Sequence, residues 1–246
     1  MRIALLLVAV LLLAGSAAAD DGKQLFGRYC ASCHGPNGEG SAGQRYGGSQ
    51  ARNQSVQTGK GPSLHGVGAL SADFYLRTGY MPLKRNGLQP RRSRLLLAPD
   101  QIDALIGYVA SLGAGPPVPT PHPERGNLSE GMQLFRTHCA GCHQIVAEGG
   151  YVTNAVPPAL GEATPTQIAE AVRIGPYVMP RLSKRAISDR RLDSIIRYVR
   201  YADHPDNRGG WALGNIGPIP EGLVSWFIAG SVLLGVCLVI GKRLRG

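Results

Sequence analysis

Cys30-Ala31-Ser32-Cys33-His34 and Cys139-Ala140-Gly141-Cys142-His143 are two copies of one pattern, CxxCH, in a chain of 246 residues. Two thiols at this spacing can add to the two vinyl groups of haem, and the adjacent histidine then faces the iron. The pattern is therefore typical of c-type haem attachment. The alternatives are a disulfide within each motif or a zinc site, but zinc needs four converging ligands and the motifs lie far apart. The sequence predicts two covalently attached haem c groups, with these attachment residues and iron-ligating histidines: Cys30, Cys33, His34, Cys139, Cys142 and His143.

The second axial ligand of each iron is assigned by elimination among four methionines. Met1 lies in the leader, and Met132 is expected in the core because it lies on the segment leading into the second motif. Met81 and Met179 each follow one CxxCH and each precede a proline. The thioether is a soft ligand for iron, and His/Met ligation raises the reduction potential relative to two histidines. We therefore expect Met81 and Met179 to complete the two iron sites.

Both halves of the chain repeat the same order of segments around these motifs. Apolar residues at i, i+3, i+4 and i+7 predict an amphipathic helix at 102–109 and another at 192–199. Asp100 and Ser188 are their expected N-caps. The first half carries extra residues between its CxxCH and Pro62, which we expect to form a surface loop. Residues 114–126 are rich in proline and are expected to form an extended, semi-rigid spacer.

The repeated order of helix, CxxCH, loop, methionine loop and helix resembles class I cytochrome c in each half. The resemblance implies an all-α fold in which the two terminal helices cross and the loops wrap the haem. Pro62 and Pro158 match the family's proline, whose carbonyl accepts a hydrogen bond from the ligand histidine. The predicted cytochrome c domains are residues 20–113 and residues 127–204, joined by the spacer at 114–126.

The two ends of the chain indicate export and membrane anchoring. Residues 1–19 contain one basic residue, an apolar run and a small-residue stretch, as a secretory signal does. Residues 223–241 carry no charge and are long enough as a helix to cross a bilayer. The basic tail at 242–246 places the C-terminus in the cytoplasm and the haem domains on the extracytoplasmic side of the plasma membrane. Residues 205–222 form a lead-in to this predicted single transmembrane helix.

Composition excludes several other classes of protein. Lys and Arg number 26 against 16 Asp and Glu, but aromatic residues are only 6%, without the interleaving that nucleic-acid binding needs. The chain also lacks a GxxxxGK[ST] motif and any long alternation of Val/Ile-rich strands with helices, which argues against a large α/β enzyme. No residue set for quinol oxidation is present. We therefore expect an electron-transfer subunit with no catalysis of its own and no nucleic-acid partner.

The order of signal, two haem domains and one C-terminal span resembles the dihaem cytochrome c subunit of the actinobacterial-type cytochrome bc complex. Residues 209–222, just before the span, strengthen the match. The resemblance implies a cytochrome b subunit and a Rieske iron–sulfur subunit as partners. It also implies a haem–copper oxidase, whose copper site receives the electrons. As a hypothesis, the resemblance further implies that the second haem lies near the Rieske protein and the first near the oxidase.

Two alternatives remain open at this stage. The chain could be the cytochrome c subunit of a periplasmic dehydrogenase that feeds substrate electrons into the respiratory chain, since the haem chemistry would be the same. A dihaem peroxidase is less favoured, because it needs an open sixth coordination site.

Basic residues after each methionine suggest a rim that steers acidic partners. They are Lys84, Arg85, Arg91, Arg92 and Arg94, and Arg181, Lys184, Arg185, Arg190 and Arg191.

Overall fold

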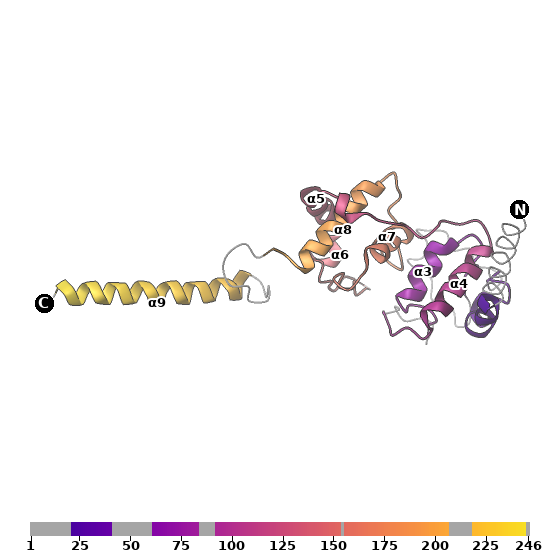
Figure 1. Ribbon diagram of the computed structural model, residues 1–246, viewed down its shortest axis with the longest axis horizontal. Helices are drawn as coiled ribbons and strands as arrows, with labels where there is room; N and C mark the ends of the chain where they lie inside the picture. The colour runs from indigo at the N-terminus through magenta and orange to yellow at the C-terminus, as the bar shows by residue number, and fades with distance from the viewer. Residues whose placement is uncertain (1–20, 41–60, 84–91, 154, 207–217, 245–246) are drawn as a thin grey trace, which may run out of the picture. The chain divides into compact units, whose positions relative to one another are not determined.

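The computed structural model describes residues 21–40, 61–83, 92–153, 155–206 and 218–244 (Figure 1). Within these ranges the chain is helical with connecting loops, and the pairing of Val152 with Ala155 is an isolated β-bridge. Residues 1–204 form one compact unit and residues 205–246 another. The all-α prediction is therefore confirmed. The signal at 1–19 and most of the extra loop before Pro62 lie outside the described residues.

The first half of the larger unit is built on crossed terminal helices. Its elements are a helix at residues 21–29, α2 (Ala31–His34), α3 (Gly68–Arg77) and α4 (Pro99–Ser111). Gly22 lies against the Ala104 carbonyl of α4, where a Cβ would collide. The rings of Phe26 and Tyr108 then meet with centroids 5.1 Å apart, and Phe26 is fully buried.

The second half repeats this crossing with the corresponding residues. Its elements are η1 (Pro123–Arg125), α5 (Leu128–His138), α6 (Ala140–His143), α7 (Pro165–Ile174) and α8 (Asp189–Asp203). Gly131 of α5 lies against the Ser194 carbonyl of α8. The rings of Phe135 and Tyr198 are 5.3 Å apart. A glycine at the crossing point lets two helix backbones approach closely. Both halves therefore pack their terminal helices through a glycine, Gly22 in the first and Gly131 in the second.

The helix starts follow local capping chemistry. The side chains of Asn127, Thr164 and Ser188 accept hydrogen bonds from backbone N–H groups in the first turns of α5, α7 and α8. Ser188 is therefore confirmed as an N-cap, but the prediction for Asp100 is wrong. Helix α4 begins at Pro99 and its N-cap is Ala98. Proline suits the first helical position because its missing N–H needs no partner there, so the helix starts two residues earlier than predicted.

Met132 is 43% exposed, so its prediction as a core residue is wrong. Helix α5 turns Gly131 and Phe135 toward the core. The adjacent position at 132 lies off that buried face, because successive residues in a helix point about 100° apart.

The proline-rich segment at 114–126 contains no helix or strand at 114–122, and hydrogen bonds attach it to both of its neighbours. The Pro116 carbonyl accepts a hydrogen bond of 3.1 Å from the Leu70 N–H at the start of α3. The His122 N–H donates to the Asp193 carboxylate of α8 at 2.7 Å. The segment is therefore bonded to both cytochrome halves, which a spacer joined only at its ends would not be.

The smaller unit contains α9 (Pro218–Leu244), which extends beyond the predicted span at both ends. Residues Gly222–Leu244 are long and apolar enough to cross a membrane, with a mean hydropathy of 2.5. Most of the lead-in at 205–222 lies outside the described residues.

Candidate haem sites

Each CxxCH motif is folded into a single helical turn that starts at its first cysteine. The backbone N–H groups of Cys33 and His34 donate to the Cys30 carbonyl at 3.1 and 2.9 Å. In the second half the matching bonds to the Cys139 carbonyl measure 3.0 and 2.9 Å. All of these cysteines are free thiols. The disulfide alternative is thus not adopted, and each turn presents two thiols and an imidazole together.

The imidazole of each motif is oriented by a proline carbonyl. Nδ1 of His34 lies 2.8 Å from the Pro62 oxygen, and Nδ1 of His143 lies 3.0 Å from the Pro158 oxygen. A carbonyl can only accept, so Nδ1 carries the proton and Nε2 keeps its lone pair. Burial lowers the pKa of His143, although its bond to Pro158 acts in the opposite direction. A neutral ring with a free Nε2 is the form that binds a metal ion.

The predicted methionine ligands lie against the same cores as the cysteines. Met81 and Cys30 both pack on the cluster of buried residues around Phe26. Met179 and Cys139 both pack on the cluster around Phe135. Each half therefore gathers thiols, an oriented imidazole and a thioether around one apolar core, and this donor set fits haem c. The assignment of individual iron ligands stays a prediction.

The first thiol of each motif is shielded from water. Burial, and to a lesser degree the charge of the second cysteine, raises the pKa of Cys30 and of Cys139 to about 11. Both are protonated at neutral pH. Thioether formation adds S–H across a vinyl double bond, with sulfur on one carbon and hydrogen on the other, so attachment consumes no external oxidant.

Comparisons with known proteins identify the family. The family model "Cytochrome c" matches residues 19–113, and the model "Cytochrome C oxidase, cbb3-type, subunit III" matches residues 126–199. The "Cytochrome bc1 complex cytochrome c subunit" of Mycobacterium bovis is 37% identical over 238 residues, which cover 93% of this chain and 79% of that protein. Its counterpart in Corynebacterium diphtheriae is 31% identical over 242 residues, covering 91% and 80%. This chain belongs to the cytochrome bc1 complex cytochrome c subunits.

The predicted family, the two cytochrome c domains and the C-terminal candidate span are therefore confirmed. The role of this chain is electron transfer by cytochrome c domains, and such domains imply haem c as the cofactor. A solved Kuenenia stuttgartiensis structure, "reducing HAO-like protein complex Kustc0457/Kustc0458", aligns at 17% identity with a TM-score of 0.36, over 74% of this chain and 95% of that one.

A cluster of three tyrosines joins the two cytochrome c domains of this bc1-type subunit. The ring of Tyr177 lies 6.2 Å from that of Tyr75 and 5.7 Å from that of Tyr80, centroid to centroid. Both contacts are edge-on, the geometry that aromatic pairs favour. Sequence reasoning missed this cluster. The signal was present, since Tyr80 directly precedes Met81 and Tyr177 lies two residues before Met179.

A buried pair of acids accompanies the tyrosines. Glu170 of α7 is fully buried, and neither of its carboxylate oxygens has a hydrogen-bond partner of regular geometry among the described residues. It faces Asp73 of α3, which is 7% exposed and bonded to Arg77 at 2.9 Å. Burial first, and the charge of Asp73 second, raise the pKa of Glu170 to about 9, against the opposing effect of Arg77. Glu170 is therefore protonated at neutral pH.

We expect the buried Glu170 to make stability depend on pH. The unfolded glutamate loses its proton near its ordinary pKa of 4.5, whereas the folded one keeps it up to about 9. The folded state thus binds more protons in this window, and stability falls as pH rises through it. Glu170→Gln should flatten that decline and stabilise the protein at pH 8–9 by about 1–3 kcal/mol. Denaturant titrations from pH 5 to 9 measure this, with the exposed Glu148→Gln as control. A slope that Glu170→Gln leaves unchanged would contradict it.

Proposed function

We propose that this subunit relays electrons through two haem c groups, from the Rieske centre of a quinol-oxidising cytochrome bc complex to a haem–copper oxidase. The curated relatives support the first part, since they are named as subunits of the cytochrome bc1 complex. The cytochrome b subunit and the Rieske subunit are the partners that this membership implies. The oxidase, with its copper electron-entry site, is the proposed acceptor. Such a subunit would replace a mobile cytochrome by an anchored one.

The observation that carries the relay is the contact between the two methionine loops. Tyr80 adjoins Met81, Tyr177 is close to Met179, and their rings are 5.7 Å apart. Helices α3 and α7, which lead into these loops, also contact one another. Electron transfer slows steeply with distance, so a protein must hold its redox groups close together. Packed contact at these loops supports direct transfer from one domain to the other.

The chain's own residues divide the work at each proposed site. When bound, each haem c supplies a one-electron Fe(III)/Fe(II) couple. Thioether bonds to the cysteines would fix the macrocycle to α2 and α6. The proline carbonyls hold the imidazoles in the ligating tautomer, through Pro62 at His34 and Pro158 at His143. Methionine at the sixth position would disfavour small-molecule binding, which suits a relay rather than a peroxidase.

We also propose the orientation of the chain in the membrane. Helix α9 would cross the plasma membrane once, and Lys242 and Arg243 in its last turn would lie in the cytoplasm. Both cytochrome domains then lie on the extracytoplasmic side, as the predicted signal at 1–19 requires. Haem c attachment outside the cytoplasm agrees with this orientation.

A redox difference spectrum tests the assembly. The tagged protein is purified from native membranes in mild detergent and reduced with quinol. Haem b and haem a bands beside the haem c band are expected, reducible by quinol and sensitive to inhibitors of the bc complex. A haem c band alone, with a dehydrogenase co-purifying, would replace this proposal by the dehydrogenase-subunit alternative.

Charge reversal tests the proposed docking rim. Lys84 and Arg85 lie outside the described residues, whereas Arg181 and Arg185 are exposed in the second domain. If the oxidase docks on the first domain, Lys84→Glu with Arg85→Glu should slow electron delivery to it roughly threefold to tenfold at low salt. The matched pair Arg181→Glu with Arg185→Glu should leave delivery to the oxidase unchanged. Stopped-flow oxidation across a salt series measures both. Equal rates and salt slopes in the Lys84/Arg85 variant and the parent protein would contradict the prediction.

A further inference from the structure

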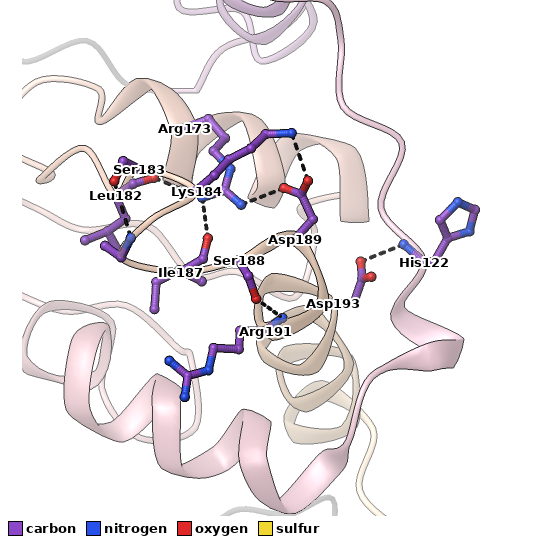
Figure 2. A network of polar contacts seen from close by, with 11 residues as sticks. His122, Arg173, Leu182, Ser183, Lys184, Ile187, Ser188, Asp189, Arg191 and Asp193 are labelled. Carbon is purple, nitrogen blue, oxygen red and sulfur yellow. Dashed lines mark hydrogen bonds and ion pairs between the residues drawn. The ribbon is translucent and has the colours of Figure 1, made fainter.

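The loop that carries Met179 is held by one buried guanidinium. Arg173 lies in the last turn of α7, and its side chain is only 10% exposed. It donates to the carbonyls of Leu182 at 3.0 Å and Ile187 at 2.8 Å, and to the Asp189 carboxylate at 2.8 Å (Figure 2). The two carbonyls lie on the chain between Met179 and α8, and Asp189 is the first residue of α8. Arg173 therefore joins one helix, the methionine loop and the next helix.

Neighbouring bonds show that this attachment is part of an ordered loop. Leu182 N–H donates back to the Val172 carbonyl of α7 at 2.9 Å. Ile187 is fully buried, and its N–H donates to the Ser183 carbonyl at 2.9 Å. Gly175 ends α7 in the left-handed region at φ 67°. A Cβ at this position would collide with the backbone of Arg181. The loop therefore leaves α7 at Gly175 and comes back against the same helix at Leu182, whose carbonyl accepts from Arg173.

Lys184 provides an internal comparison. Its Nζ also bonds to Asp189, at 2.8 Å, but the side chain is 75% exposed (Figure 2). Its bond to Asp189 is an exposed pair, which contributes little. The Arg173 guanidinium instead satisfies two loop carbonyls, and losing a buried partner costs more than losing a surface pair. A lysine ammonium cannot reproduce this planar set of donors.

The first domain repeats the arrangement in part. Arg77 occupies the last turn of α3, at the position that corresponds to Arg173. It bonds to Asp73 on its own helix at 2.9 Å and also to Asp103 of α4. In both domains an arginine before the methionine loop is therefore tied to an acid on the C-terminal helix. Residues 84–91 of the first methionine loop lie outside the described part of the chain.

We infer that Arg173 is a positioning residue for the Met179 thioether. The inference rests on the proposed role of Met179 as axial ligand. By fixing the Leu182 and Ile187 carbonyls, the guanidinium keeps the sulfur where a haem iron can be reached. Without it, two carbonyls lose their donor and the loop rearranges to recover hydrogen bonds. The sixth position then opens to external ligands, while the thiols and His143 remain in place.

The test uses the full-length protein with both haems, purified in detergent, as parent, Arg173→Gln, Arg173→Lys and Lys184→Ala. The readouts are haem content, the methionine–iron charge-transfer band of the ferric protein, and carbon monoxide binding to the ferrous protein. Arg173→Gln should lose up to half of the band and bind carbon monoxide at one of two haems, roughly tenfold or more tightly than the parent. Arg173→Lys should show the same change to a smaller extent, and Lys184→Ala should match the parent.

Met179→Ala separates failure of the inference from failure of the ligand assignment. If Met179→Ala loses half of the band but both Arg173 variants keep full band and full haem content, the positioning role of Arg173 is wrong. If Met179→Ala itself leaves the band and carbon monoxide binding unchanged, Met179 is not the ligand, and both claims are overturned. Arg173→Lys keeps the positive charge, so it provides the decision if Arg173→Gln does not accumulate.

Discussion

Replacing Cys139 and Cys142 together by serine should reduce covalent haem from two groups to one per chain. Serine hydroxyls do not form thioethers with vinyl groups, so the second CxxCH loses attachment while the first keeps its own. Among the described residues, Cys30 and Cys139 pack on two different clusters of buried residues that have no member in common. Loss of one attachment site should therefore leave the other intact. Electron delivery through the subunit should fall to background, since a relay needs both steps.

The measurement is the haem-to-protein ratio of purified chains, together with haem staining after denaturing electrophoresis. Cys30→Ser with Cys33→Ser is the matched variant in the first domain and should also retain one haem. Two haems in either double variant, or none in both, would show that the motifs do not act as independent attachment sites.

A side chain at Gly131 should cause the largest loss of stability among single substitutions of the second domain. A Cβ at this position would collide with the Ser194 carbonyl oxygen and lie 2.6 Å from its carbon. Because the Ser194 oxygen and carbon both belong to the backbone of α8, they cannot move aside without separating α8 from α5. That separation would open the contact between Phe135 and Tyr198, whose rings are 5.3 Å apart. Gly131→Val should therefore cost about 3 kcal/mol or more of unfolding free energy.

Gly27→Ala is the control for this prediction. It lies in the N-terminal helix of the first domain, and a Cβ there meets nothing within 4 Å. Replacing a helical glycine by alanine without a clash should stabilise the protein by about 0.5–1 kcal/mol. Denaturant unfolding followed by circular dichroism and by the haem Soret band compares the two variants. Equal stabilities for Gly131→Val and the parent would mean that the helices do not cross at this glycine.

Local patterns predicted much of the fold, and the resemblance that they carry to known cytochromes predicted the family. The CxxCH spacing is set by the geometry of the haem vinyl groups, so it is readable without knowing what surrounds it. The apolar period of 192–199 predicted α8, because burial of one helix face requires that period. An uncharged run at 223–241 predicted the helix within α9, because a bilayer core excludes charge.

Other features needed the tertiary structure, because they depend on which segments meet. The exposure of Met132 follows from the face that α5 presents to α8, which the haem motif does not specify. The burial of Glu170 results from contact with α3 of the other domain, and by sequence alone a glutamate is expected in water. In the sequence, nothing distinguishes Arg173 from the other basic residues. Only the tertiary structure shows that its side chain donates to two loop carbonyls.

Short patterns in the sequence predict the chemistry of this protein: two haem-attachment motifs, two methionines before proline and an apolar C-terminal segment. These are short-range signals, each set by a covalent spacing or a helical period. The tertiary structure decided how the two halves are joined, through Tyr177 against Tyr75 and Tyr80 and through Glu170 beside Asp73. Such contacts link residues about a hundred positions apart, and no local periodicity encodes them.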